Sequence, residues 1–403
     1  MNTVANRAVV NRRVFYIPGY DPFHPRRYRE LYRKEAAAQA AISGYQIGLK
    51  PKSGKGRYGW QVQATIGSAV TADVEVLVWS DLVLSSMGSS IAATYLQLVQ
   101  TAWAYIGSGA LFRLMRLRKG PMIAALYPIG MLILQLMVAG LLGWVAGWIA
   151  GFALPGPLAL VAGIAVIPFV LRWWRRHDRH FYAYYLMHDY AFTAAAQGAI
   201  PPELEARMQG FGQTIAAALQ SDADEVLVVG HSSGAHLAVS VLADLIRSGS
   251  VPADGPALGF LSLGQVVPMV SFLPKAGRLR ADLAYLSARS ELTWVDVTAP
   301  GDGCAFALCD PVAVSGVSPP DKRWPLVISA AFTQSLSPER WKELRWRFFR
   351  LHFQYLCAFD RPKDYDYFQI TAGPLTLADR YNGRTPSRSR IETPVNRYRT
   401  LVA

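Results

Sequence analysis

The stretch Glu225–Ser240, EVLVVGHSSGAHLAVS, decides the fold. Its apolar run is typical of a strand that is buried on both faces of a parallel sheet. A Gly-His-Ser-Ser-Gly turn follows, and an alanine-rich helical pattern begins immediately after it. Gly230 and Gly234 would let the strand and the helix pass close together, and the N-terminus of the helix points at Ser232. The pattern predicts a strained strand–turn–helix corner with Ser232 at its tip.

The remaining soluble part of the chain alternates between strand-like and helix-like segments, which is the pattern of an α/β sheet. A further helix is predicted after the capping residue Ser337, followed by an irregular basic tail. Strands are predicted at residues 12–18, 58–66, 74–80, 225–229, 259–264 and 291–300, and helices at 26–41, 202–220 and 235–249.

Through VLVVGHSSGAHLA and the order of the elements around it, the chain resembles the α/β-hydrolase superfamily. The resemblance implies a mostly parallel sheet flanked by helices, acyl-transfer chemistry, and a triad in the chain order Ser, Asp or Glu, His. Ser232 would be the nucleophile, and Gly230, His231 and Gly234 would complete the elbow. A histidine at the position of His231 is frequent in lipases and thioesterases without a catalytic role.

The oxyanion hole that the resemblance implies would use two backbone N–H groups. One belongs to Ser233, directly after the nucleophile. The other belongs to Tyr20 in the loop FYIPGYDPF, which ends an early strand and carries Gly19 for a close approach. The loop has no His-Gly-Gly sequence, so this assignment rests on position, and an ordinary Pro-Gly turn is the alternative.

The acid of the triad is expected after a strand that follows the elbow. Asp302 lies in a Gly-Asp-Gly loop just beyond the strand LTWVDVTAP. Asp310 is the second choice, and Asp296 lies within the strand itself, where it would point into the sheet. The alternative for Asp302 is a purely structural Asp-Gly turn.

The base is expected to be a histidine, which can accept the serine proton near neutral pH. His352 is the only histidine after Asp302, so the chain order selects it. It lies in an aromatic run that reads as a helix end, whereas the base in this superfamily usually follows the last strand. His188 and His24 are the alternatives if the order is broken, and His236 is expected to pack or to face solvent.

No charged residue occurs from Gly120 to Leu171. A membrane-spanning helix needs roughly 20 apolar residues, so this run accommodates two spans and a tight turn. The spans are predicted at about 127–151 and 158–174, with the turn at 154–157. Basic clusters precede and follow the hairpin, so both lie on the same side of it. The positive-inside rule makes that side cytoplasmic. A buried hairpin in a soluble core is the alternative.

Glycines repeat every four residues in the first predicted span, at Gly143, Gly147 and Gly151, and form a small face on which the second helix could pack. The preceding segment, 82–112, is also uncharged but contains many Ser, Thr, Gln and Gly residues, so it is expected to be an interfacial or re-entrant helix. A third span is the alternative there.

These features divide the chain into four parts, in which the membrane hairpin is inserted before the elbow. The predicted parts are the first part of the α/β-hydrolase domain (1–81), an interfacial segment (82–120), the transmembrane hairpin (121–174), and the second part of the domain with its basic tail (175–403).

The 403 residues carry a net charge of +13, which suits either nucleic acid or an anionic membrane surface. No nucleic-acid-binding motif, P-loop or zinc spacing is found, so we expect the lipid bilayer as the partner, no nucleic acid, no metal and no cofactor. The three cysteines form no close pair, which fits a reducing compartment.

Together these observations predict a membrane-anchored serine hydrolase that cleaves a carboxylic ester, with a lipid or acyl substrate entering from the bilayer. The expected location is the bacterial inner membrane or its equivalent, with the catalytic domain in the cytoplasm. Two alternatives stay open: an acyltransferase or thioesterase with the same site, and a catalytically inactive scaffold with the hydrolase fold.

Overall fold

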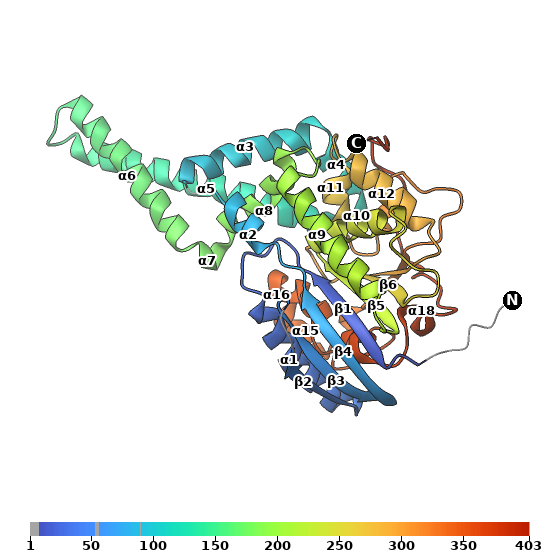
Figure 1. Ribbon diagram of the computed structural model, residues 1–403. Helices are drawn as coiled ribbons and strands as arrows, with labels where there is room; N and C mark the ends of the chain where they lie inside the picture. Colours follow the sequence, from blue (N-terminus) through green and yellow to red (C-terminus); the bar gives the residue numbers. More distant parts are fainter. Residues whose placement is uncertain (1–7, 53–55, 89, 403) are drawn as a thin grey trace.

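A computed structural model describes residues 8–52, 56–88 and 90–402 (Figure 1). Its centre is an eight-stranded sheet in the order β2-β3-β4-β1-β5-β6-β7-β8. Of these strands only β3 runs opposite to the others. The predicted α/β class with a mostly parallel sheet is therefore confirmed. The strands are β1 (Asn11–Ile17), β2 (Gln46–Pro51), β3 (Gly59–Ile66), β4 (Ser68–Val76), β5 (Glu225–His231), β6 (Ala257–Leu263), β7 (Thr293–Thr298) and β8 (Leu326–Ser329).

The strand predicted at 74–80 is wrong in its position. Strand β4 begins at Ser68 and ends at Val76, because it forms a tight hairpin with β3 in which Ile66 pairs with Ser68. The turn residue between them, Gly67, has a φ of 79°, which favours glycine. Strands β2 and β8 lie outside every predicted strand. Both are edge strands of the sheet. Strand β2 is largely exposed and lacks an apolar pattern, whereas β8 is apolar and buried but only four residues long.

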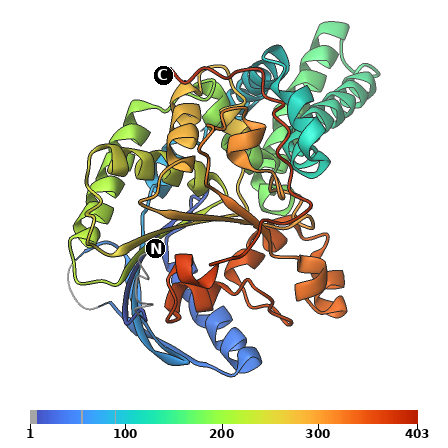
Figure 2. The same cartoon turned by 90° about the vertical axis from the view of Figure 1, so that its right-hand side faces the viewer.

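Helices cover both faces of the sheet (Figure 2). Along β1, Val14 and Tyr16 face one hydrophobic core while Phe15 and Ile17 face the other. This two-sided burial explains why the central strands are apolar throughout. The first core is closed by α1 (Arg26–Ser43), α15 (Pro338–Leu344), α16 (Phe348–His352), α17 (Tyr367–Ala372) and α18 (Leu377–Arg380), and the second by α9 (Pro202–Leu219), α10 (Ser233–Arg247) and α12 (Gly277–Ser287).

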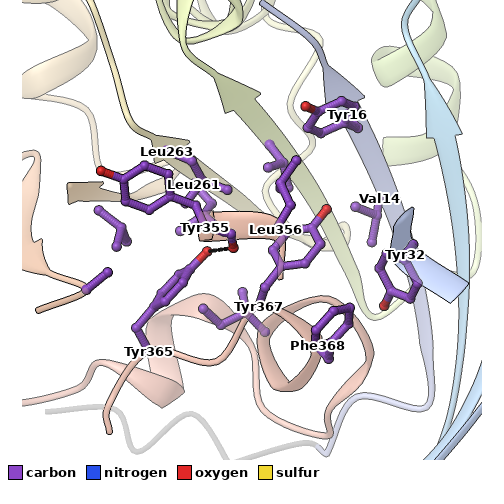
Figure 3. Packing of buried hydrophobic residues seen from close by; sticks show 14 of the residues in the cluster. Val14, Tyr16, Tyr32, Leu261, Leu263, Tyr355, Leu356, Tyr365, Tyr367 and Phe368 are labelled. Atoms are coloured by element: carbon purple, nitrogen blue, oxygen red, sulfur yellow. Dashed lines mark hydrogen bonds between the residues drawn. The ribbon is translucent and has the colours of Figure 1, made fainter. Parts of the chain in front are cut away.

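The first core is rich in tyrosine (Figure 3). Tyr32 from α1 and Tyr367 from α17 lie with their ring centroids 5.8 Å apart beneath β1. Close by, the Tyr365 hydroxyl donates a hydrogen bond of 2.6 Å to the backbone carbonyl of Tyr355. These contacts fix the C-terminal segment that contains α16 and His352 against the sheet.

Two long apolar helices, α5 (Lys119–Ala150) and α6 (Gly156–Arg176), form a hairpin that extends away from the sheet (Figure 1). Both are long and apolar enough to cross a membrane, with mean hydropathies of 2.1 and 1.8. The predicted turn is present, although α5 begins earlier than predicted and continues through Pro128.

The glycine face of the hairpin packs as predicted. A Cβ atom on Gly143 would lie 2.8 Å from the Gly163 carbonyl oxygen, and one on Gly147 would lie 3.2 Å from the carbonyl oxygen of Ala159. The two backbones therefore approach too closely for side chains at these positions. Trp144 and Trp148, near the turn, are exposed.

A group of helices joins the hairpin to the sheet. Helix α3 packs along α8 and presents an exposed apolar face, Leu96, Val99, Trp103 and Ile106, at helical spacing. The predicted helical character of segment 82–112 is confirmed, with a bend of 100° between α2 and α3. The group contains α2 (Ser80–Ser86), α3 (Ile91–Gly107), α4 (Ala110–Leu117), α7 (Asp178–Phe181) and α8 (Ala183–Ala195); the remaining short helices are α11 (Val267–Ser271), α13 (Pro311–Val314), α14 (Phe332–Ser335) and η1 (Gln354–Leu356).

Candidate active site

Ser232 lies at a sharp corner between β5 and α10. Its backbone has φ 56° and ψ −121°, a conformation that a non-glycine residue adopts only under strain. The Ser232 N–H donates a hydrogen bond of 2.9 Å to the Leu263 carbonyl at the end of the neighbouring strand β6. The strained strand–turn–helix corner expected from the sequence is therefore present, and it directs the serine to the carboxyl end of the sheet.

Gly230 and Gly234 leave no room for side chains. A Cβ atom on Gly230 would lie 2.8 Å from the Cα atom of Ala235, so strand and helix do pass too close there. At Gly234 the obstacle is different, because a Cβ atom would lie 2.1 Å from the carbonyl oxygen of Ile17. The second glycine thus admits the end of β1 to the corner, in addition to the strand–helix contact expected from the sequence.

The loop after β1 borders the serine. A Cβ atom on Gly19 would lie 3.0 Å from the Ser232 Cβ atom and 3.4 Å from its Oγ atom. Next along this loop is Tyr20, and in the described part of the chain no backbone hydrogen bond uses its N–H group. Ser233 is the first residue of α10, where backbone N–H groups have no partner inside the helix. The two backbone segments expected to supply oxyanion donors therefore adjoin Ser232.

Asp302 and His352 form a buried pair. His352 Nδ1 lies 2.7 Å from Asp302 Oδ2, although the two residues are 50 positions apart. The other carboxylate oxygen, Oδ1, accepts the Cys304 backbone N–H at 2.9 Å. Burial would raise the pKa of Asp302, but His352 and the donated hydrogen bonds outweigh it and hold this pKa below its ordinary value. An ionised Asp302 accepts the Nδ1 proton, so in the neutral imidazole tautomer that this bond favours, Nε2 is the acceptor.

The His352 ring lies next to the strand end that binds Ser232. A Cβ atom on Gly264 would lie 3.1 Å from His352 Cε1. Gly264 directly follows Leu263, whose carbonyl accepts the Ser232 N–H. The expected serine, histidine and acid are thus gathered at the carboxyl ends of three adjacent strands, β5, β6 and β7.

His231 stabilises the backbone of the candidate base. Its Nε2 atom lies 3.0 Å from the His352 carbonyl oxygen, and the two rings are 4.8 Å apart. Burial and then the nearby His352 lower the pKa of His231 to about 3, so His231 is neutral near pH 7. Since the partner is a carbonyl, Nε2 carries the proton and donates it.

The two alternative acids are engaged elsewhere. Asp310 caps α13 and forms an ion pair of 2.6 Å with Lys322 Nζ. Asp296 is fully buried within β7, as expected from its place in the strand, and accepts the Ser262 hydroxyl at 2.6 Å. Neither has a hydrogen bond to a histidine among the described residues.

The alternative histidines also have other partners. His188 Nδ1 lies 2.7 Å from Gln97 Oε1 in the helix group below the hairpin. The ring of His24 packs edge-on against Tyr58. His236 is buried in α10, where burial lowers its pKa to about 4, so it packs rather than facing solvent.

Sequence reasoning missed two polar residues near the pair. The Tyr355 hydroxyl donates to Asp302 Oδ2 at 3.0 Å and accepts the Ala299 N–H at 2.9 Å, so it supports the carboxylate from the opposite side to Cys304. It follows His352 by three residues but lies in the separate short helix η1, so no local motif marks it. Asp189 on α8 also reaches His352 electrostatically, and no sequence motif marks it.

One group of side chains has the donor atoms for a metal ion. Single ligand atoms of Asp302, Cys304 and His352 lie within 4.8 Å of one another. Burial raises the pKa of the Cys304 thiol well above its ordinary value, and metal binding would need the thiolate. The hydrogen bond between the other two residues would also have to break. The arrangement therefore suits proton transfer better than metal binding.

The base of the apolar hairpin touches the loop that carries Asp302. A Cβ atom on Gly120, in the first turn of α5, would lie 3.2 Å from the Gly303 Cα atom. Just before this helix, Arg118 Nε donates to the Ala307 carbonyl at 2.7 Å. The acid loop is thus in direct backbone contact with the apolar hairpin.

No protein-family model, no curated protein and no solved structure matches this chain.

Proposed function

We propose that this protein is a membrane-anchored serine hydrolase that cleaves carboxylic esters of lipid or other acyl substrates. One observation carries the proposal: the strained Ser232 lies at the end of β5 while a buried His352–Asp302 pair lies at the ends of the adjacent strands. A strained serine at a strand–helix corner, an imidazole and an ionised carboxylate are the groups that acyl transfer requires. This arrangement also supports a hydrolase-like reading of the α/β sheet.

In the proposed reaction Ser232 Oγ attacks the ester carbonyl carbon, and His352 Nε2 accepts its proton. Asp302 holds the Nδ1 proton and stabilises the imidazolium that forms. The backbone N–H groups of Ser233 and Tyr20 would stabilise the oxyanion. The protonated His352 then gives its proton to the departing alkoxide, and an activated water molecule releases the acyl group from Ser232.

The hairpin supports a substrate that reaches the site from the bilayer. It meets the acid loop at Gly120, and basic residues flank both of its helices at this same end. By the positive-inside rule this end lies at the cytoplasmic face, together with the sheet. The exposed apolar face of α3 adjoins the same helix group and suits a place in the membrane interface.

The proposal is tested by covalent labelling of the purified full chain in detergent or nanodiscs with an alkyl fluorophosphonate. The wild-type protein should be labelled and should hydrolyse a long-chain ester, whereas Ser232→Ala should show neither property. Ser221→Ala is the matched control and should behave as wild type, because Ser221 lies in the connection between α9 and β5, away from the corner. Labelling that persists in Ser232→Ala would refute the assignment. Failure of the folded wild type to react at all would favour a catalytically inactive scaffold.

A further inference from the structure

Helix α8, which follows the hairpin, covers the candidate site. The Tyr185 hydroxyl donates a hydrogen bond of 2.5 Å to the carbonyl of Tyr20, in the loop beside Ser232. Two helical turns further along α8, the centroid of the Phe192 ring lies 5.6 Å from that of Tyr20. Asp189 lies four residues after Tyr185 and three residues before Phe192, so it occupies the same face of α8. Its carboxyl group is therefore directed toward the loop and the site.

The electrostatic neighbours of Asp189 agree with this placement. Its charge acts on His352 and on the Cys304 thiol in the acid loop. It also acts on Tyr20, where burial and then the nearby charge oppose ionisation of the phenol. The titratable groups that interact electrostatically with Asp189 come from five parts of the chain: Tyr20, Tyr105, Tyr185 with Tyr190, Cys304 and His352.

Within the described residues, no hydrogen bond or ion pair reaches the Asp189 carboxyl group. The basic side chain that also acts on Tyr185 is Arg27, and it forms an ion pair of 3.1 Å with Asp21 instead. An ionised carboxylate away from water is costly unless a cation or hydrogen-bond donors compensate it. Consistent with this, burial raises the pKa of Asp189 to about 7, although His352 lowers it in part.

Asp189 is partly exposed as a residue. The surrounding side chains are aromatic, and the rings of Tyr20, Tyr185 and Phe192 adjoin one another. A carboxylate beside aromatic faces is the environment that attracts an ammonium group, through charge and through cation–π contacts. A ligand of this class would supply the compensating charge that the chain itself does not.

We propose that Asp189, with Tyr20, Tyr185 and Phe192, forms a subsite for an ammonium group carried by the ester substrate. The inference rests on the proposed function, and it narrows the substrate class to esters with a positively charged nitrogen close to the scissile bond. Asp189 is a specificity-determining residue in this scheme and takes no part in proton transfer.

The test compares three esters of one long-chain acid: the choline ester, the ethanolamine ester, and the uncharged 3,3-dimethylbutyl ester, which has the shape of the choline ester. Wild-type kcat/KM should be at least about tenfold higher for a charged ester than for the neutral one. Asp189→Asn, which keeps the size but not the charge, should lose this preference, measured as the ratio of kcat/KM for the charged and the neutral ester. Asp254→Asn, at an exposed aspartate, is the matched control and should retain the preference.

The choline and ethanolamine arms distinguish a quaternary from a primary ammonium group. Equal rates for all three esters, or an equal preference in Asp189→Asn, would overturn the subsite. If hydrolysis still depended on Ser232 in that case, the proposed function would stand. If no ester is cleaved, binding of hexyltrimethylammonium and of neutral 3,3-dimethylbutanol to Ser232→Ala is measured by calorimetry. Selective ammonium binding that disappears in Ser232→Ala/Asp189→Asn supports the subsite, and equal weak binding of both ligands overturns it.

Ammonium binding should also strengthen as the pH rises through about 7, because the ionised form of Asp189 is the one that binds. A neutral ligand that only accepts a hydrogen bond from the protonated acid would show the opposite trend. Affinity for the ammonium ligand that falls over this pH range would contradict the proposal.

Discussion

Strand β5 and helix α5 both contain long apolar runs, yet their surroundings differ completely. Every residue of β5 is buried between two layers of helices. In the most apolar window of α5 only 22% of the residues are buried. The apolar composition is thus shared, while length separates the two: a strand of 7 residues fits inside a sheet, and a helix of 32 residues exceeds any layer of this domain.

Both regions use glycine to bring two backbones together, but the neighbours differ. Gly234 admits the end of β1 to the corner of the candidate site, and Gly143 admits α6 to α5. In the sheet the contact is enclosed on all sides, so a new methyl group has nowhere to go. In the hairpin the two helices pack mainly on each other and are largely exposed on their other sides, so they have more freedom to separate. The two glycines therefore allow the difference between the regions to be tested.

The largest effect is expected for Gly234→Ala. Its new Cβ atom would lie 2.1 Å from the Ile17 carbonyl oxygen, so β1 or α10 must move. We expect the free energy of unfolding to fall by about 3 kcal/mol or more, measured by thermal or denaturant unfolding of the detergent-solubilised chain. Gly212→Ala is the control, because a Cβ atom there meets nothing within 4 Å and a helix prefers alanine. Equal stability of the two variants would show that the corner is looser than described.

An intermediate effect is expected for Gly143→Leu, which should weaken packing of the hairpin by roughly 1–2 kcal/mol and leave unfolding of the sheet unchanged. The reporter is a disulfide between Gly151→Cys and Ala159→Cys, since a Cβ atom on Gly151 would lie 3.9 Å from that of Ala159. The disulfide should form readily in membranes. Gly143→Leu should lower its yield.

Gly140→Leu is the control for the hairpin, because a Cβ atom on Gly140 meets nothing within 4 Å. The disulfide should form in this variant as in the parent. If Gly143→Leu instead lowered the stability of the sheet, the hairpin and the sheet would have to be treated as one cooperative unit.

The smallest effect is expected for Asp296→Asn in the core of β7. Burial raises the pKa of Asp296 to about 8, against about 3.9 in an unfolded chain. Between these values the folded chain binds more protons than the unfolded one, so its stability falls as the pH rises. The asparagine variant retains an acceptor for Ser262 without this penalty. Its Tm should therefore exceed that of wild type by a few degrees at pH 7.5 and by less at pH 5; a constant difference would contradict the assigned titration.

Much of the fold was predictable because its signals are local. The corner at Ser232 needs only a strand, two glycines and a helix within 16 residues, and the sequence displays all of them. The hairpin is marked by an uninterrupted apolar run with a Pro-Gly turn. Chain order selected His352, and the Gly-Asp-Gly loop after a predicted strand selected Asp302; the two share a hydrogen bond.

The missed features depend on contacts between distant segments. Strand β2 alternates weakly because it is an exposed edge strand, and the end of β4 is set by its hairpin with β3. Tyr355 becomes a partner of Asp302 only when α16 docks beneath the sheet. Asp189 is an unremarkable acid within its own helix, and the positions of Tyr20 and His352 around it arise from the assembled fold.

The contact between Gly120 and Gly303 has a mechanical consequence. Both residues at this contact are glycines, so their backbones meet directly and no flexible side chain can absorb a displacement of α5. A long apolar helix changes its tilt when the thickness of the bilayer changes. If α5 spans a bilayer, a change of tilt at its foot would be transmitted to the loop whose Asp302 is hydrogen-bonded to His352, and bilayer thickness would then affect the proposed reaction.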